Sequence, residues 1–160
     1  MKEKTSTKDL EISSNERLYI ENTSIFKPKQ YSNLFPTNFS IYSFHAGFKK
    51  KNNDLLLVIF NKNVNVHCVY SKTSTPSAPI IWDKKNNKGK CKILVVNSGN
   101  ANAHTGNKGI LTINKYAKFI SDKMKCKKSE ILVSSTGVIG EIFNPKLIIN
   151  SLNKFTSTKK

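Results

Sequence analysis

Short apolar runs separated by polar residues predict several β-strands in this chain. Residues 54–60 are apolar after the first position, which is typical of a strand buried on both faces. Residues 64–70 alternate between apolar and polar side chains, and the turn-like residues 61–63 before them predict a hairpin. Residues 91–96 and 130–134 are further apolar runs of strand length. The pattern therefore predicts four strands.

Two later stretches repeat apolar residues every three or four positions, which predicts amphipathic helices. The apolar face of the first helix comprises Ile113, Ala117, Ile120 and Met124. The second helix begins near Asn144 and Pro145, because asparagine is a good N-cap and proline suits the first helical position. Its apolar face comprises Ile148, Leu152 and Phe155. Strands that alternate with helices predict an α/β fold of mixed β-sheets with packed helices.

The composition of the chain changes near Leu34. Residues 1–34 are polar, lack sustained periodicity and hold 6 basic and 5 acidic residues. Residues 35–160 hold 21 basic and 5 acidic residues, together with all the predicted strands and helices. We therefore expect a polar N-terminal extension over residues 1–34 and one folded domain over residues 35–160.

The formal net charge of +17 raises the possibility of a nucleic-acid-binding protein. Arg17 is the one arginine among 27 basic residues. Arginine is the side chain that binds phosphates and guanine edges in bidentate fashion, so its scarcity argues against a specific nucleic-acid site. The charge favours solvated lysines over a nucleic-acid partner, and a non-catalytic basic module that binds nucleic acid is the alternative.

Other features limit the location and the cofactors of the protein. The apolar runs are too short to span a bilayer, and the N-terminus lacks the apolar segment of a signal peptide. An odd number of cysteines without a CxxC pair indicates reduced thiols and a cytoplasmic location. The cysteines are Cys68, Cys91 and Cys126. The histidines lack the spacing of metal ligands, so no metal is expected. They are His45, His67 and His104.

A segment rich in glycine and asparagine, residues 97–109, follows the third predicted strand. Such a segment suits a backbone that approaches an anion or makes a tight turn. Its glycines do not match the Walker spacing, and Gly109 occupies the position where a hydroxyl would bind magnesium. The dinucleotide pattern GxGxxG fails because residue 101 is alanine. No nucleotide cofactor is predicted.

Residues 135–140 follow the fourth predicted strand and are expected to form a loop. Thr136 supplies a hydroxyl donor, and Gly137 allows the backbone to turn an N–H group toward a reacting oxygen. Two fixed donors are what an oxyanion hole requires. Ser-Thr-Gly segments are also common connecting turns, so the spacing alone leaves both interpretations open.

Two long motifs resemble the ornithine acetyltransferase (glutamate N-acetyltransferase) family. Residues Asn97–Gly106 read NSGNANAHTG, and residues Val133–Gly140 read VSSTGVIG, in the order and at the distance that the family has. Shorter blocks also follow the family in order, at residues 35–39, 46–49, 54–57, 69–72 and 78–80. The resemblance covers roughly residues 35–149, and it implies the N-terminal part of the ornithine acetyltransferase fold.

The resemblance implies acetyl transfer from N-acetylornithine to glutamate in arginine biosynthesis, and in some members from acetyl-CoA to glutamate. Family precursors cleave themselves into two chains, and the new N-terminal threonine of the second chain is the nucleophile. By the motif match, Thr136 and Gly137 stabilise the tetrahedral oxyanion. The acetylornithine-dependent reaction requires no cofactor and no metal.

The family's remaining catalytic elements have no counterpart in these 160 residues. The substrate-binding threonine and lysine and the Ala-Thr cleavage junction are not found, and neither Thr156 nor Thr158 lies in a family-like junction. We therefore expect the alpha-chain portion of the enzyme, truncated before the self-cleavage site, without a nucleophile and inactive by itself. It would require a second (beta) chain, unless it is a non-catalytic fragment.

Overall fold

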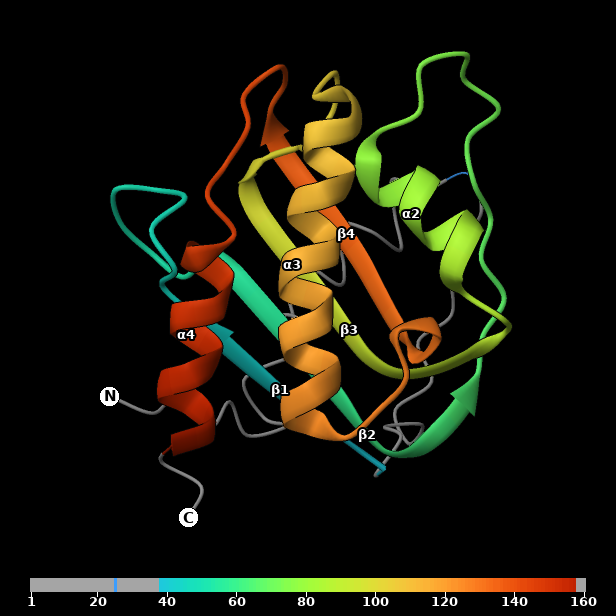
Figure 1. Cartoon of the computed structure of the whole chain (residues 1–160), viewed down its shortest axis with the longest axis vertical. Coiled ribbons are helices and arrows are strands. Elements are labelled where there is room, and N and C mark those ends of the chain that lie inside the picture. Colours follow the sequence, from blue (N-terminus) through green and yellow to red (C-terminus); the bar gives the residue numbers. More distant parts are fainter. Residues whose placement is uncertain (1–24, 26–37, 158–160) are drawn as a thin grey trace. The chain divides into compact units, whose positions relative to one another are not determined.

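The structure, a computed structural model, describes Ile25 and residues 38–157. Residues 38–157 form a four-stranded sheet with helices on one face (Figure 1). The four strands are β1 (Phe39–Phe44), β2 (Leu55–Asn65), β3 (Lys90–Asn100) and β4 (Ile131–Val138). The helices are α2 (Ala78–Asn86), α3 (Gly106–Met124), the short 3-10 helix η2 (Lys128–Glu130) and α4 (Lys146–Ser157). The expected extension over residues 1–34 lies outside the described residues, apart from Ile25.

The sheet is mixed, with strand order β1-β2-β3-β4. β1 pairs antiparallel with β2, and β2 pairs antiparallel with β3. β3 and β4 are parallel, and α3 lies between them in the sequence, because a parallel pair needs a long crossover connection. The prediction of an α/β fold with a mixed sheet is therefore confirmed.

The core lies between the sheet and its helices. Alternate strand residues point to the same face of a sheet, and on β2, β3 and β4 these residues are buried. They are Leu55, Leu57, Ile93, Val95, Ile131 and Val133. In Figure 1, α2, α3 and α4 all lie over one face of the sheet. The apolar residues of the helices complete the same cluster.

Both predicted helices are present with the predicted apolar faces. On α3, Ile113, Ala117 and Ile120 are buried, and Met124 packs against the core at the end of the helix. On α4, Ile148 and Leu152 are buried and Phe155 is partly buried. Asn144 caps α4 as expected, because its Oδ1 accepts a hydrogen bond from the Lys146 N–H at 3.0 Å.

The predicted hairpin at residues 61–63 is wrong. β2 continues as one strand to Asn65, and its last two residues pair with Cys91 and Lys90 of β3. The register shifts between Ile59 and Val64, so residues 61–63 form an irregularity inside the strand. Pairing with β3 therefore decides the conformation of a segment whose local composition favours a turn.

The sequence pattern also missed two elements, β1 and α2. α2 begins at Ala78, directly after residues 71–77, which are rich in serine, threonine and proline, and it buries Trp82 and Asp83 as well as its first two residues. The Trp82 indole N–H donates to Asn114 Oδ1 of α3 at 3.1 Å. A buried face that contains an aspartate does not produce the apolar periodicity by which a helix is predicted.

Asp83 links α2 to the last strand in the sheet order. Its buried carboxylate accepts the Val133 N–H, at 3.2 Å to Oδ1 and 3.4 Å to Oδ2. The carboxylate thereby satisfies a backbone donor of β4. Burial raises the pKa of Asp83 to about 7, and the hydrogen bond from Val133 opposes that rise.

The raised pKa of Asp83 predicts a specific pH dependence of stability. The native carboxyl holds its proton up to about pH 7, whereas the unfolded chain releases it near pH 4. The native state therefore binds more protons between these values, so the free energy of unfolding falls as the pH rises from about 4 to about 7. Asp83→Asn removes this component, while the amide oxygen still accepts from Val133. Urea unfolding of both proteins at several pH values measures the difference, and equal slopes would contradict the prediction.

Candidate functional site

Thr136 and Gly137 lie near the end of β4, where this strand still pairs with β3. The expectation that residues 135–140 form a loop is wrong for the first four, because β4 continues through Val138. Thr136 lies beside Ser98, and Gly137 lies beside Gly99, in the parallel register. The two residues that the sequence nominates as oxyanion donors therefore have positions fixed by a neighbouring strand.

Glycine is required at this point of the pairing. Gly137 has φ 130° and Gly99 has φ 109°, both in the region that favours glycine. A Cβ atom added to Gly137 would overlap the carbonyl carbon of Gly99 and lie 2.6 Å from its oxygen. The two backbones are therefore in direct contact, and no side chain separates β3 from β4 here.

The side chain of Thr136 is exposed. None of the hydrogen bonds within the described residues uses its hydroxyl group, so it does not bond its own backbone as a turn-forming threonine does. Gly137 is exposed as well. A hydroxyl donor with no acceptor among the described residues, next to a constrained glycine, can donate to an external oxygen atom.

A buried asparagine fixes the residue that precedes Thr136. Asn97 is 1% exposed, and its Oδ1 accepts a hydrogen bond from the Ser135 hydroxyl at 2.6 Å. Its Nδ2 donates to the Asn100 carbonyl at 2.8 Å. Both polar ends of the amide are thus satisfied, as a buried polar group requires. Asn97 joins the end of β3 to the segment that presents Thr136.

A second asparagine joins the segments that follow β3 and β4. Asn100 donates from Nδ2 to the Glu141 carbonyl at 2.9 Å, and its Oδ1 accepts from the Asn102 N–H at 2.8 Å. Two backbone hydrogen bonds of 2.9 Å join the same segments, from Ala101 N–H to Val138 O and from Gly140 N–H to Ala103 O. The sequence pointed to these asparagines because of the backbone conformations that they tolerate. The structure shows that their side chains also form hydrogen bonds.

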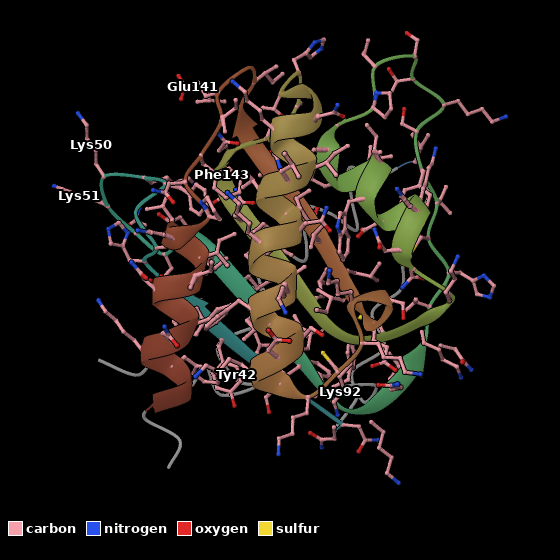
Figure 2. The ribbon with its side chains drawn as sticks, in the orientation of Figure 1. Tyr42, Lys50, Lys51, Lys92, Glu141 and Phe143 are labelled. Carbon is pink, nitrogen blue, oxygen red and sulfur yellow. The ribbon has the colours of Figure 1, made fainter. Side chains whose placement is uncertain are left out.

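Three apolar side chains are exposed directly after the Thr136–Gly137 pair. Val138 is 49% exposed, Ile139 is 63% exposed and Ile142 is 50% exposed. Phe143, by contrast, turns inward and is buried (Figure 2). Exposed apolar residues that lie close together in the sequence beside a polar site are typical of a surface that another polypeptide covers.

The described residues offer no metal site. No group of three or more His, Cys, Asp or Glu side chains within residues 38–157 could hold a metal ion. The three cysteines are free thiols, with Cys68 exposed, Cys91 buried and Cys126 between these extremes. Among the helices of this part of the chain, none has both the length and the apolar character that a membrane crossing requires.

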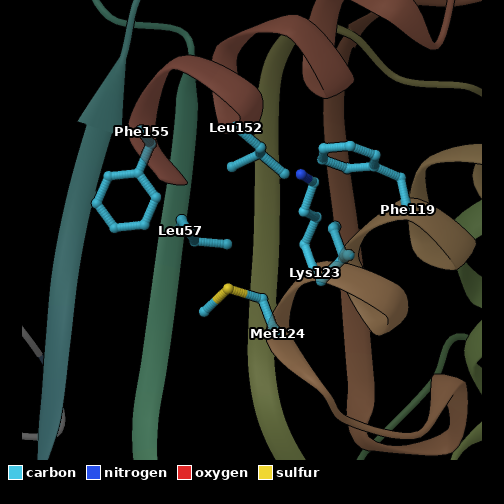
Figure 3. Close-up of a pocket in the computed structure, with 7 residues that line it drawn as sticks. Leu57, Phe119, Lys123, Met124, Leu152 and Phe155 are labelled. Carbon is cyan, nitrogen blue, oxygen red and sulfur yellow. The ribbon is translucent and has the colours of Figure 1, made fainter. Parts of the chain in front are cut away.

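An apolar pocket lies between α3, α4 and β2 (Figure 3). It is lined by Leu57, Phe119, Ile120, Lys123, Met124, Leu152 and Phe155. The pocket adjoins the C-terminal end of α3, whereas Gly106 at the start of that helix follows the segments beside the site. A helix of 19 residues is about 28 Å long, so the two features are well separated. Apart from Lys123, the lining contains no group suited to acid–base chemistry.

The model of the ArgJ family matches residues 40–160. The chain belongs to the ArgJ family. The Arginine biosynthesis bifunctional protein ArgJ of Bartonella henselae is 37% identical over 142 residues, which cover 82% of this chain and 35% of the relative. The chain therefore spans about a third of the length of that relative.

Two solved structures of related enzymes have the same fold. The Arginine biosynthesis bifunctional protein argJ of Bacillus halodurans is 28% identical, with a TM-score of 0.70 over 74% of this chain and 63% of the other. The ornithine acetyltransferase of Mycobacterium tuberculosis, solved with ornithine, is 23% identical, with a TM-score of 0.70 over 76% of this chain and 67% of the other. The family resemblance and the fold predicted from the sequence are confirmed.

Proposed function

We propose that this chain takes part in N-acetyl transfer from N-acetylornithine to glutamate, in arginine biosynthesis in the cytoplasm. Membership of the ArgJ family supports the reaction class, and the bound ornithine in the Mycobacterium tuberculosis structure agrees with the substrate class. The proposal includes acetyl-CoA as a second acetyl donor. The observation that carries the proposal is the Thr136–Gly137 pair, with an exposed hydroxyl and a backbone fixed against β3.

In this proposal Thr136 and Gly137 stabilise the oxyanion. A threonine hydroxyl from the complementary part of the enzyme attacks the acetyl carbonyl carbon and loses its proton to a base. The carbonyl oxygen then becomes negatively charged and accepts hydrogen bonds from this chain. As the tetrahedral intermediate collapses, the base gives its proton to the departing ornithine amine, and the acetyl group remains as an ester on the threonine. The glutamate amine then attacks this ester through a second tetrahedral intermediate, and the threonine hydroxyl is regenerated. One such donor contributes about 3–4 kcal/mol to transition-state stabilisation.

The proposed partner is a second (beta) chain that carries the nucleophilic threonine. The chain covers 35% of its Bartonella henselae relative, so a complete enzyme of this family is much longer than these residues. The exposed Val138, Ile139 and Ile142 support contact with another polypeptide beside the site. In this view residues 35–160 form the N-terminal portion of the acetyltransferase domain, and the 160-residue chain is inert by itself.

A reconstitution experiment tests the proposal. The 160-residue chain is co-expressed with the complementary remainder of the Bartonella henselae relative, and the product is termed the reconstituted complex. Ornithine release from N-acetylornithine plus glutamate is expected from the reconstituted complex, at a rate that each part alone does not reach. Turnover by the isolated chain would contradict the expectation that the chain lacks a nucleophile. A stable complex without any turnover would contradict the proposed activity.

A further inference from the structure

Asp54, a buried acidic residue at the start of β2, organises the loop that connects β1 to β2. It is 3% exposed, and its carboxylate accepts three backbone hydrogen bonds from that loop. The donors are Ala46 N–H at 2.6 Å, Lys49 N–H at 2.9 Å and Gly47 N–H at 3.2 Å. The main-chain carbonyl of Asp54 also accepts the Ser98 N–H at 2.8 Å. One residue thus connects the loop to the end of β3.

The same loop presses its backbone against Gly99. A Cβ atom added to Gly99 would lie 2.9 Å from Phe48 Cβ and 3.1 Å from the Phe48 carbonyl oxygen. The ring of Phe48 also packs edge-on against Phe143, with ring centroids 4.9 Å apart. Phe48 therefore contacts β3 on one side and the segment that follows β4 on the other.

These contacts continue to the proposed oxyanion donors. Gly99, which lies under Phe48, is in direct backbone contact with Gly137. Three backbone segments are therefore stacked, and Asp54 holds the outermost one by its side chain. Lys50 and Lys51 of the same loop point away from this stack into solvent (Figure 2). Asp54 therefore fixes the side of the loop that faces the end of β4, the strand that carries Thr136.

We propose that Asp54 is a positioning residue for the Thr136–Gly137 pair, acting through Phe48 and Gly99. This inference rests on the proposed function, because it gives the stack a role in transition-state stabilisation. Oxyanion donors are effective only when their geometry is set before the reaction, and small displacements are costly. A carboxylate with three N–H donors fixes the loop more firmly than an apolar contact does, because each bond also specifies direction.

Asp54→Asn tests the proposal in the reconstituted complex. The amide keeps one acceptor but turns a donor toward backbone N–H groups, so part of the loop is released. We expect kcat to fall about tenfold or more, and KM for N-acetylornithine to change less than about twofold. Asp122→Asn is the matched control, because Asp122 is an exposed aspartate paired with Lys118 on α3, and its kcat should equal that of the unmodified chain.

A double-mutant cycle separates positioning from general loosening of the fold. If Asp54 acts through the Thr136–Gly137 pair, Asp54→Asn should lower kcat by a smaller factor in a chain that already carries Thr136→Ala than in the unmodified chain. Additive losses in kcat would overturn the proposal, and so would an unchanged kcat in the single variant. This comparison is made at a temperature where melting curves show every variant to be folded.

The amide resonances of the 160-residue chain provide a readout that does not depend on turnover. In ¹H–¹⁵N spectra, Asp54→Asn should displace the signals of Gly99 and Gly137, and Asp122→Asn should leave them in place. If Thr136→Ala leaves kcat unchanged while these signals move, the proposed function fails and the positional link stands. Unmoved glycine signals would overturn the link.

A milder variant covers the case in which Asp54→Asn does not fold. His45 is half-exposed, with Nδ1 2.8 Å from the Asn52 carbonyl and 3.6 Å from Asp54 Oδ2. His45→Ala loosens the same loop from its solvent side, and we expect it to displace the Gly99 and Gly137 signals by a smaller amount. A folded His45→Ala chain with both signals unmoved would overturn the proposal.

Discussion

Thr136→Ala is expected to lower kcat of the reconstituted complex by about 10²–10³-fold, with little change in KM for N-acetylornithine. The acetyl oxygen gains its charge only in the transition state, so a donor aimed at that oxygen affects turnover more than binding. The Thr136 hydroxyl has no acceptor among the described residues, so its removal breaks no hydrogen bond of this part of the fold. Steady-state rates of ornithine release measure both constants.

Thr136→Ser is the matched control for this prediction. Serine keeps the hydroxyl donor and loses one methyl group, so much of the rate should remain. Melting temperatures of both variants are measured on the same preparations and should lie close to that of the unmodified chain, because Thr136 is exposed. An alanine variant that is less stable but fully active per folded complex would show that Thr136 is a structural residue.

Gly137→Ala is expected to lower the free energy of unfolding of the chain by roughly 3 kcal/mol or more, and to abolish turnover of the reconstituted complex. Two costs combine at this position. A φ of 130° is unfavourable for alanine, and the new methyl group would overlap the backbone of Gly99. The strands must separate to make room, which moves Thr136 away from its present place.

Gly140→Ala isolates the conformational part of that cost. Gly140 has φ 86°, but a Cβ atom added there would meet no atom within 4 Å. We expect a loss of only about 1–2 kcal/mol, from the strained backbone alone. Urea unfolding of the two variants measures the difference. Equal losses would show that the contact between Gly99 and Gly137 is not tight enough to exclude a methyl group.

The sequence by itself was sufficient to predict α3 and α4, because each helix buries one face along a single continuous segment. Their apolar residues recur at helical spacing, and Asn144 supplies a local start signal for α4. The family was also readable from the sequence, through the two long motifs at residues 97–106 and 133–140. The ArgJ family match bears out that interpretation.

The identity of the proposed donors, Thr136 and Gly137, came from the sequence, and their role stays a prediction. Their surroundings could not be derived in the same way. Gly99 and Gly137 are 38 positions apart, and no local pattern specifies which residues of two parallel strands lie side by side. The link from Asp54 to that pair passes through a third segment, so it depends on the packing of the loop between β1 and β2.

Other differences between sequence and structure have the same physical origin. Residues 61–63 favour a turn by composition, yet hydrogen bonding to β3 keeps them within β2. α2 buries Asp83, because the carboxylate accepts a hydrogen bond from a backbone N–H of β4. A helix with a buried aspartate lacks the apolar periodicity by which helices are predicted. Local periodicity and two motifs thus determined the helices and the family. Pairing between distant strands, which satisfies backbone groups that the local sequence does not specify, decided the geometry around Thr136.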